Sequence, residues 1–206
     1  MAVEALRKDF RFTGFWVNSQ NLVVAVVFAK LPDLALLKVI SQFRYLETVC
    51  FERSRLHSDR GTGGFESSRE QSTQCVNIEH INILFAQKNL RKLQFFRIPI
   101  NSNAMGEIQS SRLVWLRLRG CNLRDTHLKQ IATCQSLTSL TLANNPKITS
   151  NGVIDLLHKL SLETLYLSQH EFSTEQRTLI AGNANGCKLM FFSRVWGGLQ
   201  SVQQPE

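Results

Sequence analysis

The sequence has no apolar run long enough to cross a lipid bilayer. Its longest run, residues 22–29, is followed by the charged residues Lys30 and Asp33, whereas a membrane-spanning helix needs about 20 apolar residues. The first residues mix charged and apolar types and lack the apolar stretch of a secretory signal. The sequence therefore predicts no membrane association and a cytoplasmic or nuclear location.

Cysteine is also sparse, and its spacing excludes the common cysteine-based frameworks. The five cysteines are Cys50, Cys75, Cys121, Cys134 and Cys187. Their number is odd and no pair has metal-finger spacing, so neither a disulfide scaffold nor a structural zinc site is indicated. Reduced, mostly buried thiols are the expected state in a cytosolic or nuclear protein.

The residue patterns of common catalytic sites are missing. The glycine-rich residues 61–64 lack the Lys-Ser/Thr pair that follows in a phosphate-binding loop, and no two histidines have the spacing that places two metal ligands on one helix face. There is no Gly-x-Ser-x-Gly elbow. The sequence thus predicts a protein that is not an enzyme and has no cofactor or metal.

The sequence does contain an internal period. The template Leu-x-x-Leu-x-Leu-x-x-(Asn/Cys)-x-Leu fits four successive segments, whose first residues are Leu90, Leu113, Leu137 and Leu162. These first residues are 23, 24 and 25 positions apart, which is the period expected for leucine-rich repeats. The turn position of the template is occupied by Cys121, Asn145 and His170 in the last three segments.

Weaker copies extend the period in both directions. One begins at Phe12, another at Leu46, and an edge strand is predicted over residues 187–193, which gives about seven units. The interval from Leu46 to Leu90 is 44 residues and contains a polar stretch, predicted as an inserted loop over residues 57–79. The interval from Phe12 to Leu46 is also too long, and either an extra strand or a helix over residues 32–43 would fill it. We expect a single domain over residues 1–196 and a flexible tail over residues 197–206.

The template predicts an α/β solenoid. Because side chains alternate between the faces of a strand, Leu116 and Leu118 should point inward while Arg117 points outward. Residues 125–132 and 153–160 show helical spacing, so each strand should be followed by a short helix. Stacking such units gives a curved parallel sheet on the concave face and helices on the convex face.

The segment from Leu113 to Leu167 resembles the ribonuclease-inhibitor-like leucine-rich repeats. Within that superfamily it is most similar to the cysteine-containing repeats of F-box proteins, because Cys121 stands at the turn, "NLRD" follows it, and "NPKITSNGV" follows in the next unit. The resemblance implies a binding surface and, for F-box members, presentation of substrates to a ubiquitin ligase. No F-box-like segment precedes the repeats, so the resemblance supports the fold more strongly than ligase recruitment.

The positive charge is concentrated in two central units. Residues 88–124 contain eight Lys or Arg and one acid, Glu107, and so supply +7 of the net charge of +8. Arginine and aromatic residues at outward-facing strand positions are the types that dominate interface hot spots. The predicted partner-binding residues are Arg91, Lys92, Phe96, Arg97, Trp115, Arg117, Arg119 and Tyr166.

These residues favour a protein-interaction scaffold as the function. Arginine binds carboxylate and phosphate groups with two parallel hydrogen bonds, so the expected partner is a protein with an acidic or phosphorylated segment. Three interpretations stay open: the recognition part of a ubiquitin-ligase adaptor, a free-standing effector that sequesters a cellular protein, and a surface for nucleic acid or another polyanion. The last is disfavoured because no nucleic-acid motif occurs and the cations lie in only two units.

Overall fold

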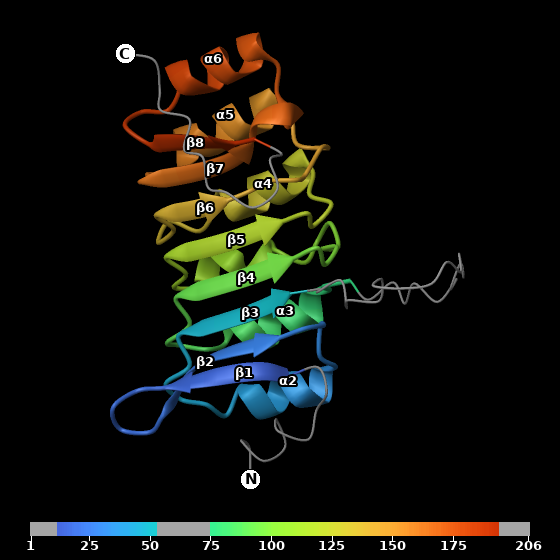
Figure 1. The fold of residues 1–206 in the computed structure, drawn as a ribbon, viewed down its shortest axis with the longest axis vertical. Helices are drawn as coiled ribbons and strands as arrows, with labels where there is room; N and C mark the ends of the chain where they lie inside the picture. Colours follow the sequence, from blue (N-terminus) through green and yellow to red (C-terminus); the bar gives the residue numbers. More distant parts are fainter. Residues whose placement is uncertain (1–11, 53–74, 194–206) are drawn as a thin grey trace, which may run out of the picture.

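The strands form one mostly parallel sheet. The structure, a computed structural model, describes residues 12–52 and 75–193, and eight strands lie side by side in chain order. They are β1 (Phe12–Val17), β2 (Val23–Phe28), β3 (Thr48–Glu52), β4 (Lys92–Phe96), β5 (Trp115–Arg119), β6 (Ser139–Thr141), β7 (Thr164–Ser168) and β8 (Lys188–Phe192). From β2 to β8 every neighbouring pair is parallel. Figure 1 shows the strands stacked along the long axis of the molecule.

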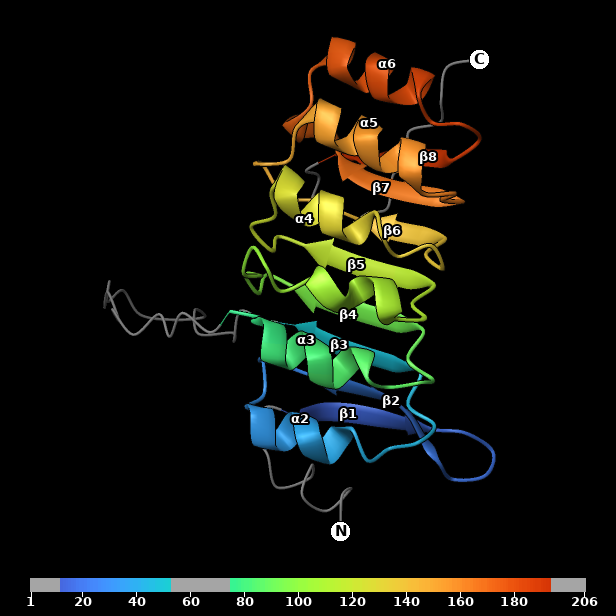
Figure 2. The ribbon, with the colours of Figure 1, turned by 180° about the vertical axis from the view of Figure 1, so that it is seen from behind.

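Helical segments connect the parallel strands, as parallel pairing requires a crossover between them. They are α2 (Leu34–Ile40), α3 (Ile78–Phe85), η1 (Gly106–Ser110), α4 (Asp125–Ile131), α5 (Ser150–Lys159), η2 (Gln169–Glu171) and α6 (Thr174–Gly182). Helices α2 to α6 lie behind the sheet in Figure 1 and in front of it in Figure 2, so they cover one face. The described part of the chain is therefore an α/β fold with one sheet and one helical layer.

Local sequence explains where the helices begin. Asp33, Thr149 and Ser173 each precede a helix and accept a hydrogen bond from the backbone N–H three residues later, which satisfies a donor that the first turn leaves free. The helix predicted over residues 153–160 and its capping segment are confirmed, because α5 begins directly after Thr149.

The periodic aliphatic residues occupy the same position in successive strands. Leu93, Leu116, Leu140 and Leu165 are register partners from β4 to β7, and each side chain has no exposed surface. The row continues to Val49 on one side. Since side chains alternate along a strand, this buried row fixes which residues point away from the helices.

The core also contains a stack of aromatic rings. Phe28, Phe51 and Phe95 are register partners on β2, β3 and β4 and are fully buried. The ring centroids are 5.6 Å apart for Phe28 and Phe51 and 5.0 Å apart for Phe51 and Phe95, with nearly parallel planes. The stack therefore joins the first three parallel strands through the core.

The first predicted unit was placed on the wrong strand. The strand that begins at Phe12 is antiparallel to β2 and forms a hairpin with it, whereas β2 itself carries the buried positions, with Val26 opposite Val49 and Phe28 opposite Phe51. The hairpin turn at Asn21 has a φ of 61°, a conformation that asparagine tolerates better than most residues. The template thus begins at Val23, which is 23 residues before Leu46.

The long interval from Phe12 to Leu46 contains strand β2 and, after it, a helix; residues 34–36, where a degenerate extra strand was the alternative, belong to that helix. Helix α2 covers Leu34–Ile40, within the predicted residues 32–43. The loop predicted over residues 57–79 ends earlier than predicted, because Val76 pairs with Ile100 and α3 begins at Ile78. The remainder of that loop and the predicted tail over residues 197–206 lie outside the described residues.

One buried asparagine, Asn145, hydrogen-bonds to the backbone of the turns that follow β5 and β6. Asn145 is 1% exposed and accepts hydrogen bonds from the backbone N–H groups of Cys121 and Leu123 at 2.9 and 3.1 Å. Its amide nitrogen donates to the carbonyls of Leu118 and Leu142, both at 2.7 Å. This side chain satisfies the backbone groups of two consecutive turns, as the template position predicts.

The other two template turn residues behave differently from each other. Cys121 is fully buried and its thiol contacts the carbonyl of Phe95 at 3.3 Å. His170, at the corresponding template position, is exposed within η2, in contrast to the buried Asn145. Burial raises the pKa of Cys121 to about 12, which keeps the thiol protonated and unreactive at neutral pH.

Candidate functional site

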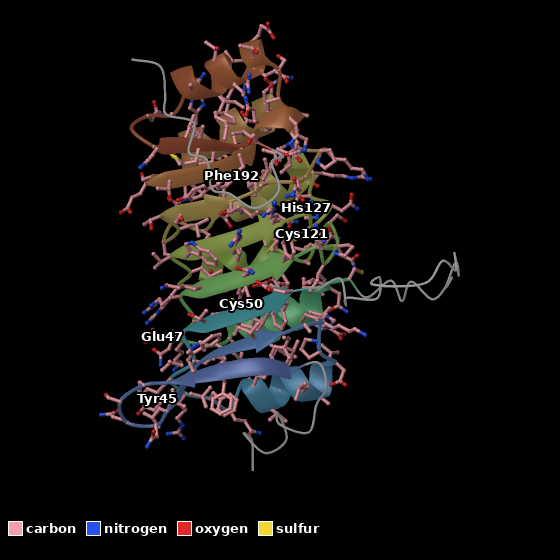
Figure 3. All side chains as sticks on the ribbon, in the orientation of Figure 1. Tyr45, Glu47, Cys50, Cys121, His127 and Phe192 are labelled. Atoms are coloured by element: carbon pink, nitrogen blue, oxygen red, sulfur yellow. The ribbon has the colours of Figure 1, made fainter. Side chains whose placement is uncertain are left out.

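The face of the sheet opposite the helices, here called the open sheet face, carries the outward-pointing side chains of all the parallel strands. They form rows across the sheet because the strand register is regular. The middle row contains Cys50, Gln94, Arg117, Thr141, Tyr166 and Met190. Figure 3 labels Cys50 over β3 and Phe192 toward the β8 end of this face, with Cys121 and His127 toward one edge of the sheet.

Four of the predicted residues come together at the carboxyl ends of β4 and β5. Phe96 and Arg119 are register partners, and Arg97 directly follows Phe96. The guanidinium carbons of Arg97 and Arg119 lie 4.9 and 5.5 Å from the centroid of the Phe96 ring, within the range of a cation–π interaction. Arg117 precedes Arg119 by two residues and so points to the same face. We call Phe96, Arg97, Arg117 and Arg119 the arginine cluster.

Two of the three guanidinium groups in the arginine cluster are incompletely hydrogen-bonded within the described residues. The Nε atoms of Arg117 and Arg119 are buried and have no hydrogen-bond partner in the described parts of the chain. Neither arginine, nor Arg97, forms an ion pair with a described carboxylate. Because an unpaired buried N–H group is costly, the cluster would gain free energy from an anion that supplies acceptors.

The same cations oppose one another electrostatically. Burial lowers the pKa of Arg119, and the positive charges of Arg117 and Arg97 lower it further. The guanidinium group of Arg119 remains charged at neutral pH, because arginine is not deprotonated under ordinary conditions. Because Arg97 and Arg119 lie over one ring and Arg117 is on the same face, their like charges repel, and a bound anion would relieve that repulsion.

Arg97 also has an unusual backbone conformation. Its φ is +58°, and the corresponding turn positions after β5 and β6 are Gly120 and Asn144, with φ of +68° and +61°. Glycine and asparagine tolerate this left-handed region, whereas arginine adopts it at a cost of about 1–2 kcal/mol. The stem of Arg97 packs over Gly120, since a Cβ added to that glycine would lie 3.5 Å from Arg97 Cγ. Strained residues of this kind cluster at functional sites.

Arg97→Gly is expected to have a free energy of unfolding about 0.5–1 kcal/mol higher than Arg97→Ala. Both variants lose the contact with Phe96, but only glycine relieves the left-handed strain, about 1–2 kcal/mol, and this should exceed the entropy that glycine adds to the unfolded chain, about 0.4–1 kcal/mol. Urea denaturation of the two variants checks this. An Arg97→Gly chain no more stable than Arg97→Ala would contradict the strain at this position.

Three further predicted residues lie at the opposite ends of the same strands. Lys92 and Trp115 are register partners at the starts of β4 and β5. Arg91 precedes β4, and its Nη1 donates to the carbonyl of Arg112 at 3.2 Å. Lys92 and Trp115 share the open sheet face with the arginine cluster but do not belong to it, whereas Arg91 lies outside the strand, and the alternation that points Lys92 outward does not place Arg91 on this face.

Tyr166 is separated from the arginine cluster and joins a residue that the sequence did not single out. It lies two strands from Arg117, with Thr141 between them, and its ring stacks on Phe192 with centroids 5.3 Å apart. Phe192 faces the same side because it is the register partner of Ser168. The expected edge strand over residues 187–193 was the signal that could have placed Phe192 on this face. We call Tyr166 and Phe192 the aromatic pair.

An acidic residue that the sequence analysis did not associate with the cations lies beside them. Glu52 is the register partner of Phe96 and accepts a hydrogen bond from Gln94 Nε2 at 2.6 Å. Burial and the charge of Glu52 raise the pKa of Cys50 to about 11, while Arg117 acts in the opposite direction. Glu52 thus marks one boundary of the positive surface.

Two cavities of the described residues lie on the helical side of the molecule. One of about 130 Å³ is lined by residues of α4 and α5, among them Leu128, Lys129 and Leu156, and another lies against α6 beside Leu179. The described residues contain no group of three or more histidine, cysteine or acidic side chains that could hold a metal ion. The open sheet face itself presents cations and aromatic rings, which suit contact with an anion and with apolar groups.

Comparison of the chain with protein-family models and with curated proteins found no match. Within residues 12–52 and 75–193, no helix is long and apolar enough to cross a membrane.

Proposed function

We propose that the chain is a leucine-rich-repeat solenoid that acts as a non-catalytic scaffold and binds a protein partner on its open sheet face. The repeat interpretation is supported by the register of Leu93, Leu116, Leu140 and Leu165 in neighbouring strands. It is also supported by the use of Asn145 at the turn. The template started at Val23 gives β2 to β8 as about seven units, with β1 covering the first of them.

The chemistry of the proposed partner is inferred from the arginine cluster. Arg97 and Arg119 lie over the ring of Phe96 with Arg117 beside them on the same face, and the Nε atoms of Arg117 and Arg119 have no acceptor in the described parts of the chain. A partner segment with carboxylate or phosphate groups would supply acceptors for them. The predicted residues Arg91, Lys92 and Trp115 would extend the contact along β4 and β5, and Tyr166 would extend it toward β8.

Two cellular roles fit such a scaffold. In the first it is the recognition part of a ubiquitin-ligase adaptor, which the similarity to F-box repeats favours. In the second it is a free-standing effector that sequesters a cellular protein. Copurification of ligase subunits with the partner would favour the first role, and a stable binary complex without them would favour the second.

The nucleic-acid interpretation is favoured by the mixture of cations with Phe96 and Trp115, because bases stack on aromatic rings. Against it, the cations occupy β4 and β5 and their flanking turns, whereas a strand-tracking surface continues along the molecule. Binding that weakens steeply with salt and ignores sequence would identify nucleic acid as the ligand.

The test is affinity capture with mass spectrometry, in which Arg117→Glu/Arg119→Glu is compared with the unmodified chain. We expect recovery of the principal partner to fall at least about tenfold, because each substitution replaces an attraction with a repulsion. The control Lys129→Glu/Lys159→Glu changes the net charge equally, at two exposed lysines of the helical face. The proposal fails if recovery is unchanged in the first variant or is reduced equally in both.

A loss of binding is informative only when the variant remains folded. Substitutions on this face should change the free energy of unfolding by less than about 1 kcal/mol. Thermal unfolding of both double variants, followed by circular dichroism, verifies that condition.

A further inference from the structure

The arginine cluster matches a phosphate better than a single carboxylate. Arg97 and Arg119 both lie over the ring of Phe96, and Arg117 and Arg97 are close enough to Arg119 to perturb it. One carboxylate would offer one negative charge and two oxygens to three guanidinium groups. A phosphate monoester carries a charge of about −1.5 to −2 at neutral pH and has three strong acceptor oxygens, so that each guanidinium can have its own acceptor.

A second contact site lies at a fixed distance on the same face. Tyr166 is in the same row as Arg117, two strands away, and neighbouring strands are about 4.8 Å apart. The two positions are therefore separated by about 10 Å, which an extended peptide spans in about three residues. Between them β6 presents the small side chains of Ser139 and Thr141, which leave space for a peptide backbone to cross the strands.

The aromatic pair offers apolar surface at this second site. The rings of Tyr166 and Phe192 are stacked and nearly parallel, 8° apart in plane, and both side chains are partly exposed. Met190 lies beside Tyr166 in the same row and is also partly exposed. An aliphatic or aromatic side chain packed here would bury apolar area on both partners.

We propose that the open sheet face binds a phosphorylated segment of a protein, extended across the strands. Its phosphate lies on Arg97, Arg117 and Arg119, and an apolar side chain about three residues away packs on Tyr166 and Phe192. The inference rests on the proposed function and specifies its ligand: a phosphoserine, phosphothreonine or phosphotyrosine with an apolar residue at a set distance.

The experiment uses fluorescein-labelled nine-residue peptides and the full chain, with binding followed by fluorescence anisotropy. Each peptide has glycine and serine as filler, one phosphoserine, and one phenylalanine separated from it by no, two or five residues, in both orders. Matched peptides replace phosphoserine with serine or glutamate, and phenylalanine with alanine. The protein variants are Arg117→Gln, Tyr166→Ala and, as a control on the helical face, Lys129→Gln.

We expect phosphoserine to bind at least about tenfold more tightly than serine, with glutamate close to serine. Two intervening residues should be the best spacing in one of the two orders. Replacing the peptide phenylalanine should weaken binding to the unmodified chain about threefold and have little effect on the Tyr166→Ala protein, as expected for two groups in contact. Arg117→Gln should reduce the phosphate preference, and Lys129→Gln should not.

Other outcomes separate the two proposals. Equal binding of glutamate and phosphoserine peptides overturns the phosphate assignment and leaves an acidic partner in place. Binding that ignores the phenylalanine or its spacing overturns the second contact. If no phosphopeptide binds while Arg117→Glu/Arg119→Glu still loses the captured partner, the inference is wrong and the proposed function stands. If a single-stranded RNA 12-mer competes out every phosphopeptide and binds with a steep salt dependence, both are wrong.

Discussion

Replacing Asn145 with alanine is expected to lower the free energy of unfolding by about 3–5 kcal/mol, the sum of several lost buried hydrogen bonds. The side chain is 1% exposed and is the hydrogen-bond partner of the backbone N–H groups of Cys121 and Leu123. Each orphaned buried N–H costs about 1–3 kcal/mol. The carbonyls of Leu118 and Leu142 would lose a donor at 2.7 Å as well.

Asn145→Asp distinguishes loss of the donors from loss of packing. The aspartate keeps the oxygen that accepts from Cys121 and Leu123, but it places a second oxygen against two carbonyls, so it should be at least as destabilising as alanine. Asn151→Ala, at an exposed position in the first turn of α5, is the control and should change stability by less than about 0.5 kcal/mol. Urea denaturation measures all three, and a cost below about 1 kcal/mol for Asn145→Ala would show that the turns do not depend on this residue.

The central part of the sheet was predictable because the same apolar pattern is repeated in several successive segments. From Leu90 to Leu167 each strand supplies apolar residues at the same template positions, and the spacing of 23 to 25 residues leaves a single consistent alignment. Once that alignment is set, strand alternation decides that Arg117 and Arg119 point away from Leu116 and Leu118. The observed pairing of Leu93, Leu116, Leu140 and Leu165 has this alignment.

The first strands were not predictable in the same way, because residues 22–29 are almost continuously apolar and contain no alternation. An unbroken apolar run does not reveal which side chains face the core. Phe12 and Phe15 matched the template by coincidence, whereas the pairing of Val26 with Val49 shows that β2 carries the core positions.

Part of the candidate site also depended on information that strand alternation does not contain. The sequence indicated which residues are outward-facing, but not that Arg97 and Arg119 would share the ring of Phe96. Arg97 lies just after the strand and has a left-handed backbone conformation, so strand alternation does not predict where its side chain points. The stacking of Tyr166 on Phe192 likewise requires the register between β7 and β8, and that register follows from the whole array rather than from either segment.

Truncation of two adjacent phenylalanines in β4 should lower the free energy of unfolding by very different amounts. Phe95 is fully buried and stacks on Phe51, with centroids 5.0 Å apart. Phe95→Ala is therefore expected to cost about 3–5 kcal/mol, the range for removing a buried aromatic side chain. Phe96 points to the open sheet face and is partly exposed, so Phe96→Ala should cost less than about 1.5 kcal/mol, mainly the two cation–π contacts at about 0.5–1 kcal/mol each.

For peptide binding the expectation is reversed: Phe96→Ala should have the larger effect and Phe95→Ala the smaller. Without the Phe96 ring, Arg97 and Arg119 lose the surface that holds them together, so the Phe96→Ala chain should bind the phosphoserine peptide at least about threefold more weakly while remaining folded. Phe95→Ala, measured well below its unfolding temperature, should bind that peptide within about twofold of the unmodified chain, because it changes no side chain on the binding face. Equal destabilisation by both substitutions would mean that Phe96 belongs to the core. Equal binding by both would mean that the ring does not organise the arginines.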